Sequence, residues 1–299
     1  MEHKTRKAFV FTAWIGMIAF FVIIVLSYSS ALSTDSEQNR DWYSFNIHDL
    51  VFNNFVSKQS VHADTTLAFQ TGQHLSVAVE GLDVRIRSWN SDKLKIEWFF
   101  KGSKKIVKDY RFHVSREGDV IKIIGEKESS DWSKWGGFSG KVNIMIPDTV
   151  NLEVEAVGGD VRISGIAGTM QVQSIGGDIS GARISGRLNA GTSGGDISIK
   201  YADVSALTLN TSGGDISASV INDSPIITAR SIGGDIRLYL NKDVKADIDA
   251  ATTGGDVRCY YEDELEGIVK ESVIEGKING GGNRIHLRTS GGDILIASK

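Results

Sequence analysis

The sequence predicts an all-β fold, a single-stranded β-solenoid (β-helix) of about a dozen coils that follows one N-terminal transmembrane helix. Three observations lead to this prediction. A Gly-Gly-Asp triplet recurs seven times, apolar residues alternate with polar ones around each triplet, and an uncharged segment lies near the N-terminus.

The triplet is followed each time by Ile or Val. Its aspartates are Asp160, Asp178, Asp196, Asp215, Asp235, Asp256 and Asp293. Successive spacings are 18, 18, 19, 20, 21 and 37, and the last is close to two steps of the same period. We expect the glycines to supply positive φ angles at a tight corner. Each repeat is therefore expected to form one coil, with its corner at the triplet.

Apolar columns flank the aspartates. Eight residues upstream stand Leu152, Met170, Leu188, Leu207, Ile227, Ile248 and Ile285, and six upstream stand Val154, Val172, Ala190, Leu209, Ala229, Ala250 and Leu287. One residue downstream is always Val or Ile. Apolar residues separated by two indicate strands with one buried face. A propeller is the runner-up, because two repeats nearly supply a blade of about 40 to 45 residues. The equivalence of successive units favours the solenoid.

Degenerate copies of the triplet extend the repeat toward the N-terminus. Asp83 follows Gly81-Leu82 and precedes Val84, and Gly118-Asp119-Val120 is a second degenerate copy. The solenoid is expected to run from about residue 74 to Ile296, within a domain at 67–299 and without a separate N-terminal domain.

The N-terminal segment predicts a single-pass membrane protein. Residues 1–7 form a basic cytoplasmic tail, and 8–30 form the anchor, in which 19 residues from Ala8 to Leu26 carry no charge. That length spans a bilayer, and basic residues before it place the remaining chain outside the cytoplasm. Cleavage near Ala31 is the alternative, so the segment is either a retained anchor or a signal peptide.

Residues 31–66 are expected to form a linker. Within it, the aromatic spacing at 41–56 predicts a helix that either covers the first coil or lies on the membrane surface. A net charge of −4 gives no basic field for nucleic acid. The one cysteine, Cys259, excludes an intramolecular disulfide. It falls in an inward column with Ile163 and Ile199, so we expect a buried, inert thiol.

The order of motifs resembles a known family. A strand pair ends in Gly-Leu-Asp-Val, and tandem Gly-Gly-Asp units follow a Val-x-Ile-x-Ile-Pro strand at Val142–Pro147. The closing segment from Gly276 to Ile294 is the most specific part. These features resemble the bacterial β-strand-repeat family labelled "putative adhesin", a domain of unknown function. The resemblance covers Leu75 to Ile296 and implies a β-helical extracytoplasmic domain without established catalytic residues.

Stacked corners would align the aspartates, which could act in two ways. Each carboxylate could accept hydrogen bonds from N–H groups of its own turn, or the column could bind calcium. Calcium takes six to eight oxygens, and one carboxylate per corner favours the structural role. We therefore predict no metal site, no cofactor and no catalytic residues. His113 and His286 fall in strands with no partner that would form a triad.

Two surface segments are candidate binding sites. Trp132, Trp135 and Phe138 lie in a Gly- and Ser-rich loop, where they could stack on a sugar or fold over the solenoid. The acidic arc at 260–266 is expected to be solvated, and the alternative is that it binds a cation or a basic partner.

Together these features predict a non-enzymatic, membrane-anchored cell-envelope protein with an adhesin-like or structural role and a protein or glycan partner. A regulatory or sensory subunit of an envelope-stress system is an alternative. A β-helical polysaccharide lyase or hydrolase is a further one, although the mostly Ser, Thr, Asn and Gln outward positions argue against the clustered acids and bases it needs.

Overall fold

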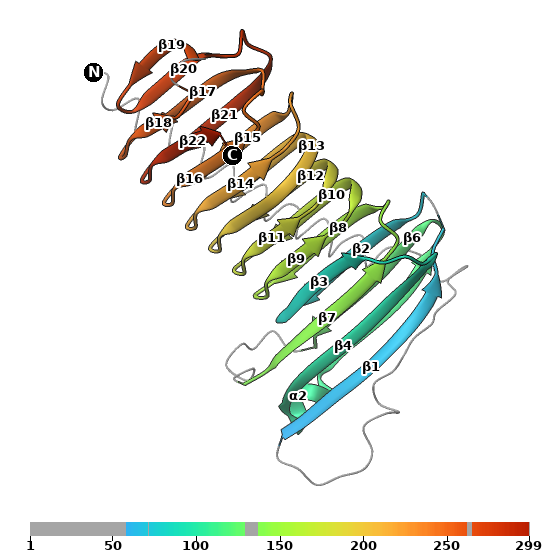
Figure 1. The fold of residues 1–299 in the computed structure, drawn as a ribbon. Helices are drawn as coiled ribbons and strands as arrows, with labels where there is room; N and C mark the ends of the chain where they lie inside the picture. The colour runs from blue at the N-terminus through green and yellow to red at the C-terminus, as the bar shows by residue number, and fades with distance from the viewer. Residues whose placement is uncertain (1–57, 71, 129–136, 262–264, 299) are drawn as a thin grey trace. The chain divides into compact units, whose positions relative to one another are not determined.

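The computed structural model describes residues 58–70, 72–128, 137–261 and 265–298. These residues form an all-β stack of coils, as predicted, and in it two sheets face each other (Figure 1). In the described part of the chain, no helix is long and apolar enough to cross a membrane. The predicted transmembrane segment, the predicted helix at 41–56, Trp132 and Trp135 all lie outside the described residues.

Sheet A supplies one layer. In spatial order it contains β5 (Tyr110–Glu117), β6 (Val120–Lys127), β2 (His74–Glu80), β8 (Asn151–Val157), β10 (Ala167–Ser174), β12 (Ser185–Thr192), the second half of β13 (Ile197–Thr211), β15 (Ile226–Arg230), β21 (Asn283–Thr289), β17 (Ala246–Thr252), β20 (Val273–Ile278) and β19 (Leu265–Lys270).

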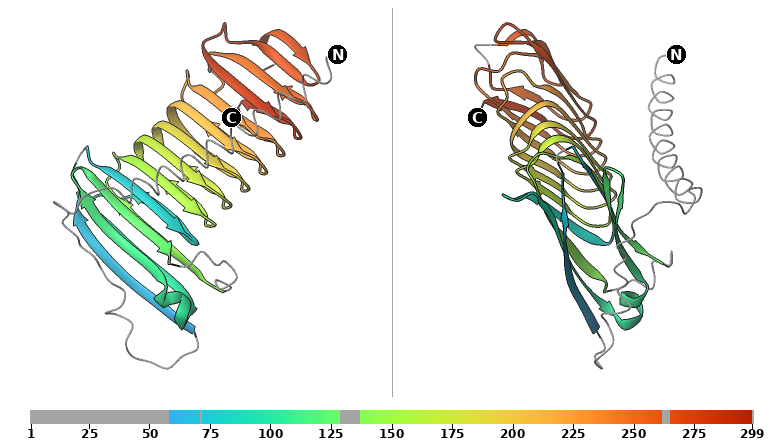
Figure 2. Two further views of the ribbon diagram at one scale, coloured as in Figure 1. Left: turned by 180° about the vertical axis from the view of Figure 1, so that it is seen from behind. Right: turned by 90° about the vertical axis from the view of Figure 1, so that its right-hand side faces the viewer.

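Sheet B supplies the facing layer (Figure 2). In the same direction it contains β1 (Lys58–Ala68), β4 (Lys93–Ser103), β7 (Ser139–Ile146), β3 (Leu82–Ser88), β9 (Val161–Ser164), β11 (Ile179–Ala182), the first half of β13, β14 (Ile216–Val220), β16 (Ile236–Leu240), β22 (Ile294–Ser298) and β18 (Val257–Cys259). Strand β1 begins before the predicted domain boundary at residue 67.

The core lies between the two sheets, and the predicted apolar columns line it. Leu188 and Ala190 of β12 face inward from sheet A, and Ile197 and Ile199 of β13 face inward from sheet B. All four side chains are at most 5% exposed. The period-two alternation therefore located the buried face of both strands in each repeat, because successive strand residues point to opposite sides.

The number and order of coils differ from the prediction. The described residues form nine coils of parallel strands, fewer than the predicted dozen, and both ends depart from chain order. The coil β6–β7 lies outside β2–β3, and the coil β21–β22 is inserted between β15–β16 and β17–β18. The 37-residue spacing therefore contains the antiparallel hairpin β19–β20 and no missing coil.

One predicted repeat is not a coil corner. Gly118-Asp119 joins β5 to β6 in an antiparallel hairpin, with Glu117 opposite Val120. Gly118 has a φ of 57°, which a glycine adopts without steric cost. The 77 residues between Asp83 and Asp160 thus hold the antiparallel strands β4 and β5 and one coil, whereas a repeat of about 19 residues would give about four coils over this length.

Aromatic side chains close the end of the stack formed by β1, β4 and β5. Trp98 stacks on Phe112 with ring centroids 4.7 Å apart, and Phe100 and Phe138 both contact Tyr110. The helix α2 (Lys104–Lys108) continues β4, and the Ser103 hydroxyl accepts a hydrogen bond from the Ile106 N–H at its start. This end is therefore closed by antiparallel strands and large rings, which replace the next coil.

Candidate functional site

The column of aspartates is present, and its carboxylates join neighbouring coils. Every Oδ1 except that of the last aspartate, Asp256, accepts a hydrogen bond from the main-chain N–H of the aspartate in the next coil, over 2.8–3.2 Å. Along the stack the order is Asp83, Asp160, Asp178, Asp196, Asp215, Asp235, Asp293 and Asp256. The expected donor was the N–H of the same turn, and this was wrong, because the donor belongs to the neighbouring coil.

Main-chain hydrogen bonds continue through the same corner. The N–H of the residue after each aspartate donates to the carbonyl oxygen of the next aspartate in the stack, as Ile197 does to Asp215 at 2.9 Å and Ile216 to Asp235 at 2.8 Å. The corners form a row along one edge of the stack (Figure 1). The ladder of each sheet is therefore not interrupted where the chain turns from sheet A to sheet B.

Arginines neutralise part of the column at Oδ2. Arg237 lies 3.0 Å from Oδ2 of Asp215 and 2.6 Å from Oδ2 of Asp235. The N–H of Asp235 is the largest cause that holds the pKa of Asp215 below its ordinary value, and Arg237 lowers this pKa further against partial burial. Among the described residues, no three His, Cys, Asp or Glu side chains are grouped to share a metal ion. Protein donors therefore offset the repulsion between stacked carboxylates.

A row of buried hydroxyls lies four residues before the aspartates. Its members are Ser174, Thr192, Thr211, Ser231, Thr252 and Thr289, each at most 8% exposed. The Thr211 Oγ1 donates to the Gly195 carbonyl oxygen of the preceding coil at 2.9 Å and accepts from the Gly214 N–H of its own turn at 3.2 Å. Each hydroxyl thus ties its corner to the coil before it. Sequence reasoning missed this row, although Ser or Thr occupies the position in six of the seven triplets.

The first triplet shows what happens without the hydroxyl. Ala156 occupies this position before Asp160, and Gly158 has a φ of 79°. No other glycine of the seven triplets has a positive φ. The corner therefore takes a different backbone conformation where no hydroxyl is available to accept the N–H of the second glycine.

Close approach explains the second glycine of each triplet. A Cβ on Gly195 would lie 2.3 Å from the Gly177 carbonyl oxygen of the preceding coil, whereas a Cβ on Gly194 would meet nothing closer than 4.0 Å. The expectation that these glycines supply positive φ is therefore wrong for every triplet except the first. The second glycine is required because a side chain would collide with the main chain of the preceding coil.

A cluster of charges holds the inserted coil β21–β22 against β17. Asp249 of β17 accepts hydrogen bonds from Arg284 at 2.6 Å, from His286 Nδ1 at 2.9 Å and from Arg288, all on β21. Burial alone would raise the pKa of Asp249, but these donors hold it well below its ordinary value. Burial lowers the pKa of His286 more than Asp249 raises it. The cluster therefore joins β21 to β17.

The remaining predicted residues are dispersed. Phe138 stacks on Tyr110 with ring centroids 4.9 Å apart and lies 5.9 Å from the Lys127 Nζ, so it packs on the closed end of the stack. Cys259 pairs with Ile296 in the predicted inward column, but it is only partly buried, because β18 is the last strand of sheet B. His113 lies in β5, opposite Ile124.

An open pocket of about 720 Å³ lies on the outer face of sheet B, over β1, β4, β7 and β3. One row of paired residues crosses its floor, and the row runs from His62 through Phe99 and Lys141 to Asp83. The neighbouring row pairs Glu97 with Asn143. Sequence reasoning missed this site, because it includes the antiparallel strands β1 and β4, which the repeat period does not align.

Comparisons with known proteins found one matching family and several similar solved structures. The family model described as Toastrack DUF4097 matches residues 72–200 and 188–297. No curated protein matches the chain significantly. Similar solved structures include a "putative cell adhesion protein" from Clostridium sporogenes ATCC 15579, with 12% identity over 81% of this chain and 100% of that chain and a TM-score of 0.37. A "putative adhesin" from Bacteroides fragilis NCTC 9343 has 13% identity over 80% and 97% of the two chains and a TM-score of 0.39.

A third similar structure is a "putative lipid binding protein" from Parabacteroides distasonis ATCC 8503. It has 13% identity, covers 80% of this chain and 96% of that chain, and has a TM-score of 0.36.

Proposed function

Because this chain belongs to the Toastrack DUF4097 family, whose model spans the stack of coils, we propose that the stack is a binding module and not an enzyme. In this proposal the protein is a membrane-anchored, adhesin-like protein of the cell envelope. Residues 8–30 anchor it, and the stack lies outside the cytoplasm. The Lys and Arg residues that precede the uncharged segment support this orientation.

The pocket on sheet B is the observation that carries the binding role. Phe99 is an outward-facing aromatic ring in the middle of a β-sheet surface, with His62 on one side and Lys141 on the other. Its strand is held rigidly, since β4 pairs with β1 over eleven residues and with β7 over seven. Ligand sites combine a few apolar surfaces with convergent polar groups in volumes of about 300–1,000 Å³, and this pocket has both features.

The chemistry of the lining favours a glycan. A sugar ring presents C–H groups on its face and hydroxyls on its edge, so it can stack on Phe99 while its hydroxyls bond to polar neighbours. Glu97 and Asn143 lie one row from the ring, and Lys101 lies on the other side. The pocket contains both acidic and basic groups, which suits a neutral or zwitterionic glycan better than a strongly charged one.

Glu153 and Glu155 are two neighbouring carboxylates on the outer face of β8, and such a pair can serve in acid–base catalysis. Burial, and then the neighbouring Glu153, raise the pKa of Glu155 on the outer face of β8. The pocket lies over sheet B and not over this strand of sheet A. The proposal therefore assigns no catalytic role to the pair, and we expect no cleavage of a bound glycan.

Binding of the full-length protein in detergent to an array of bacterial oligosaccharides tests this function. Phe99→Ala is expected to weaken binding of the best ligand about tenfold or more, because an aromatic side chain at the centre of a site commonly carries over 1 kcal/mol. Tyr239→Ala is the matched control, since Tyr239 is another half-buried outward aromatic of sheet B. New reducing ends should not appear. Equal affinities of the wild type and Phe99→Ala, or release of reducing ends, would contradict the proposal.

A further inference from the structure

The strand β19 is an edge of sheet A that is exposed along almost its whole length. Among the described residues it pairs with β20 alone. In the described part of the chain sheet B ends at β18, so none of its strands faces β19 across the core. Residues 266–270 are all exposed, and Ile268 and Val269 remain 53% and 63% exposed. At the opposite end β1 and β5 are also edge strands, since each pairs with one neighbour, but none of their described side chains is a large apolar residue exposed to solvent.

An exposed edge with two adjacent apolar side chains is a template for a further strand. Natural edges are usually protected by charges that repel an incoming strand. The charges of β19 differ from that pattern, because one of each sign lies symmetrically about Ile268. Glu266 is two residues before it and Lys270 two residues after it.

This spacing makes β19 complementary to itself. In an antiparallel pair of β19 strands centred on Ile268, each Glu266 lies opposite the Lys270 of the second copy, and the two Ile268 side chains meet on the axis. The same ion pair forms twice, as a two-fold interface requires. A parallel pairing in register would instead place Glu266 opposite Glu266, which is unfavourable. The strand therefore selects one direction and one register.

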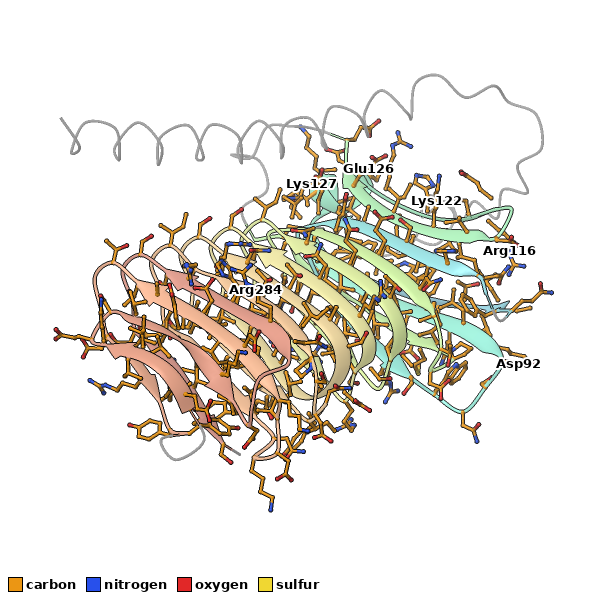
Figure 3. The ribbon with its side chains drawn as sticks, turned by 90° about the horizontal axis from the view of Figure 1, so that it is seen from above. Asp92, Arg116, Lys122, Glu126, Lys127 and Arg284 are labelled. Carbon is orange, nitrogen blue, oxygen red and sulfur yellow. The ribbon has the colours of Figure 1, made fainter. Side chains whose placement is uncertain are left out.

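The charges on the neighbouring strands also favour a second copy of β19 as the partner. On the outer face of sheet A one row runs from Arg284 of β21 (labelled in Figure 3) through Asp247 and Lys277 to Glu266. The sign of the charge alternates at each step of this row. The row ends at the edge of the sheet on the negative Glu266, so a positive residue would continue the alternation. In the antiparallel pair, Lys270 of the second copy lies at that position.

We propose that two copies of this protein pair through β19 in antiparallel register and form a two-fold dimer in which sheet A continues from one copy to the other. The dimer adds a main-chain ladder and covers the apolar side chains at the exposed edge. It also doubles the number of sheet B pockets, which would raise the avidity for a repetitive ligand. The dimer does not depend on the proposed function, because no residue of the pocket takes part.

Charge reversal at the two symmetric positions tests this dimer. The mass of the full-length protein in detergent is measured by light scattering over a range of concentrations. Lys270→Glu should weaken the dimer about tenfold or more, because two attractive pairs become two repulsive ones. Glu266→Lys should do the same. The double variant Glu266→Lys, Lys270→Glu restores both pairs and should recover the wild-type mass. Lys200→Glu is the control, since it makes the same charge change on the exposed surface of β13.

A cross-link gives an independent measurement, because a disulfide traps the dimer covalently and reports which residues meet on the axis. In a Cys259→Ser background, Ile268→Cys places one thiol of each copy on the two-fold axis, and oxidation should yield a disulfide-linked dimer. Glu275→Cys, on the exposed outer face of the adjacent strand β20, should not cross-link. A wild-type protein that remains monomeric at every concentration would overturn the proposal. So would a dimer unaffected by Lys270→Glu, or a different protein bound at β19.

Discussion

Gly195→Ala is expected to destabilise the stack by about 3 kcal/mol, which corresponds to a melting temperature lowered by about 6–12 °C for a domain of this size. The added Cβ would lie 2.3 Å from the Gly177 carbonyl oxygen and 2.6 Å from its carbon. Both atoms belong to the main chain of the neighbouring coil, so neither can move aside as a side chain would. Thermal unfolding followed by circular dichroism measures the loss.

The preceding glycine is the matched control for this prediction. A Cβ on Gly194 would have no neighbour closer than 4.0 Å, and Gly194 does not have a positive φ. Gly194→Ala should therefore leave the melting temperature within about 2 °C of the wild type, a change of less than 1 kcal/mol. Equal losses for the two substitutions would show that backbone conformation and not close approach requires these glycines.

Thr211→Val is expected to cost about 2–4 kcal/mol, because it leaves two main-chain groups of the corner without partners. The Thr211 side chain is 3% exposed, and its hydroxyl serves both the Gly195 carbonyl oxygen and the Gly214 N–H. Valine has nearly the same shape, so packing changes little and the measured loss reports the hydrogen bonds. Urea unfolding of the full-length protein gives the free energy.

Two variants make this measurement specific. Thr211→Ser keeps the hydroxyl and should recover most of the stability. Thr208→Val makes the same chemical change on the outer face of the same strand and should cost less than about 0.5 kcal/mol. If Thr211→Val were as stable as Thr208→Val, the buried hydroxyl would have no role in joining the coils.

Much of the fold follows from the alternation of apolar residues. Leu152 and Val154, and their equivalents in every later repeat, face inward as predicted. The order of the coils does not follow from this pattern, because every coil presents the same columns to both of its neighbours. The insertion of β21–β22 depends instead on particular pairs such as Asp249 with Arg288, and no period reveals such pairs.

The antiparallel direction of β4 and β5 could not be predicted from the sequence for a related reason. Strands β4 and β5 alternate as regularly as the strands of the coils, so their direction cannot be read from burial alone. The open pocket on sheet B lies over β4 and its partners. The candidate site was therefore missed where the repeat was interrupted, while the aspartate column was found because the repeat made it visible.

The two glycines of the triplet were equally conspicuous in the sequence, and they differ only in the structure. Gly194 is exposed, whereas Gly195 is buried against the preceding coil. The prediction of positive φ followed from what a glycine usually supplies at a turn. A contact between two coils cannot be recognised from one repeat alone, because the colliding atom belongs to another repeat.

The most direct test of the structural role of the corners is the melting temperature of the full-length protein and of Asp215→Ala, each in calcium and in EDTA. The Asp215 carboxylate accepts the Asp235 N–H at 2.8 Å and pairs with Arg237. Its removal should cost about 1 kcal/mol or somewhat more, equally in calcium and in EDTA. If EDTA alone lowered the melting temperature of the unmutated protein by several degrees, the aspartates would be ligands of a metal ion, and the account of the corners as a protein hydrogen-bond ladder would be wrong.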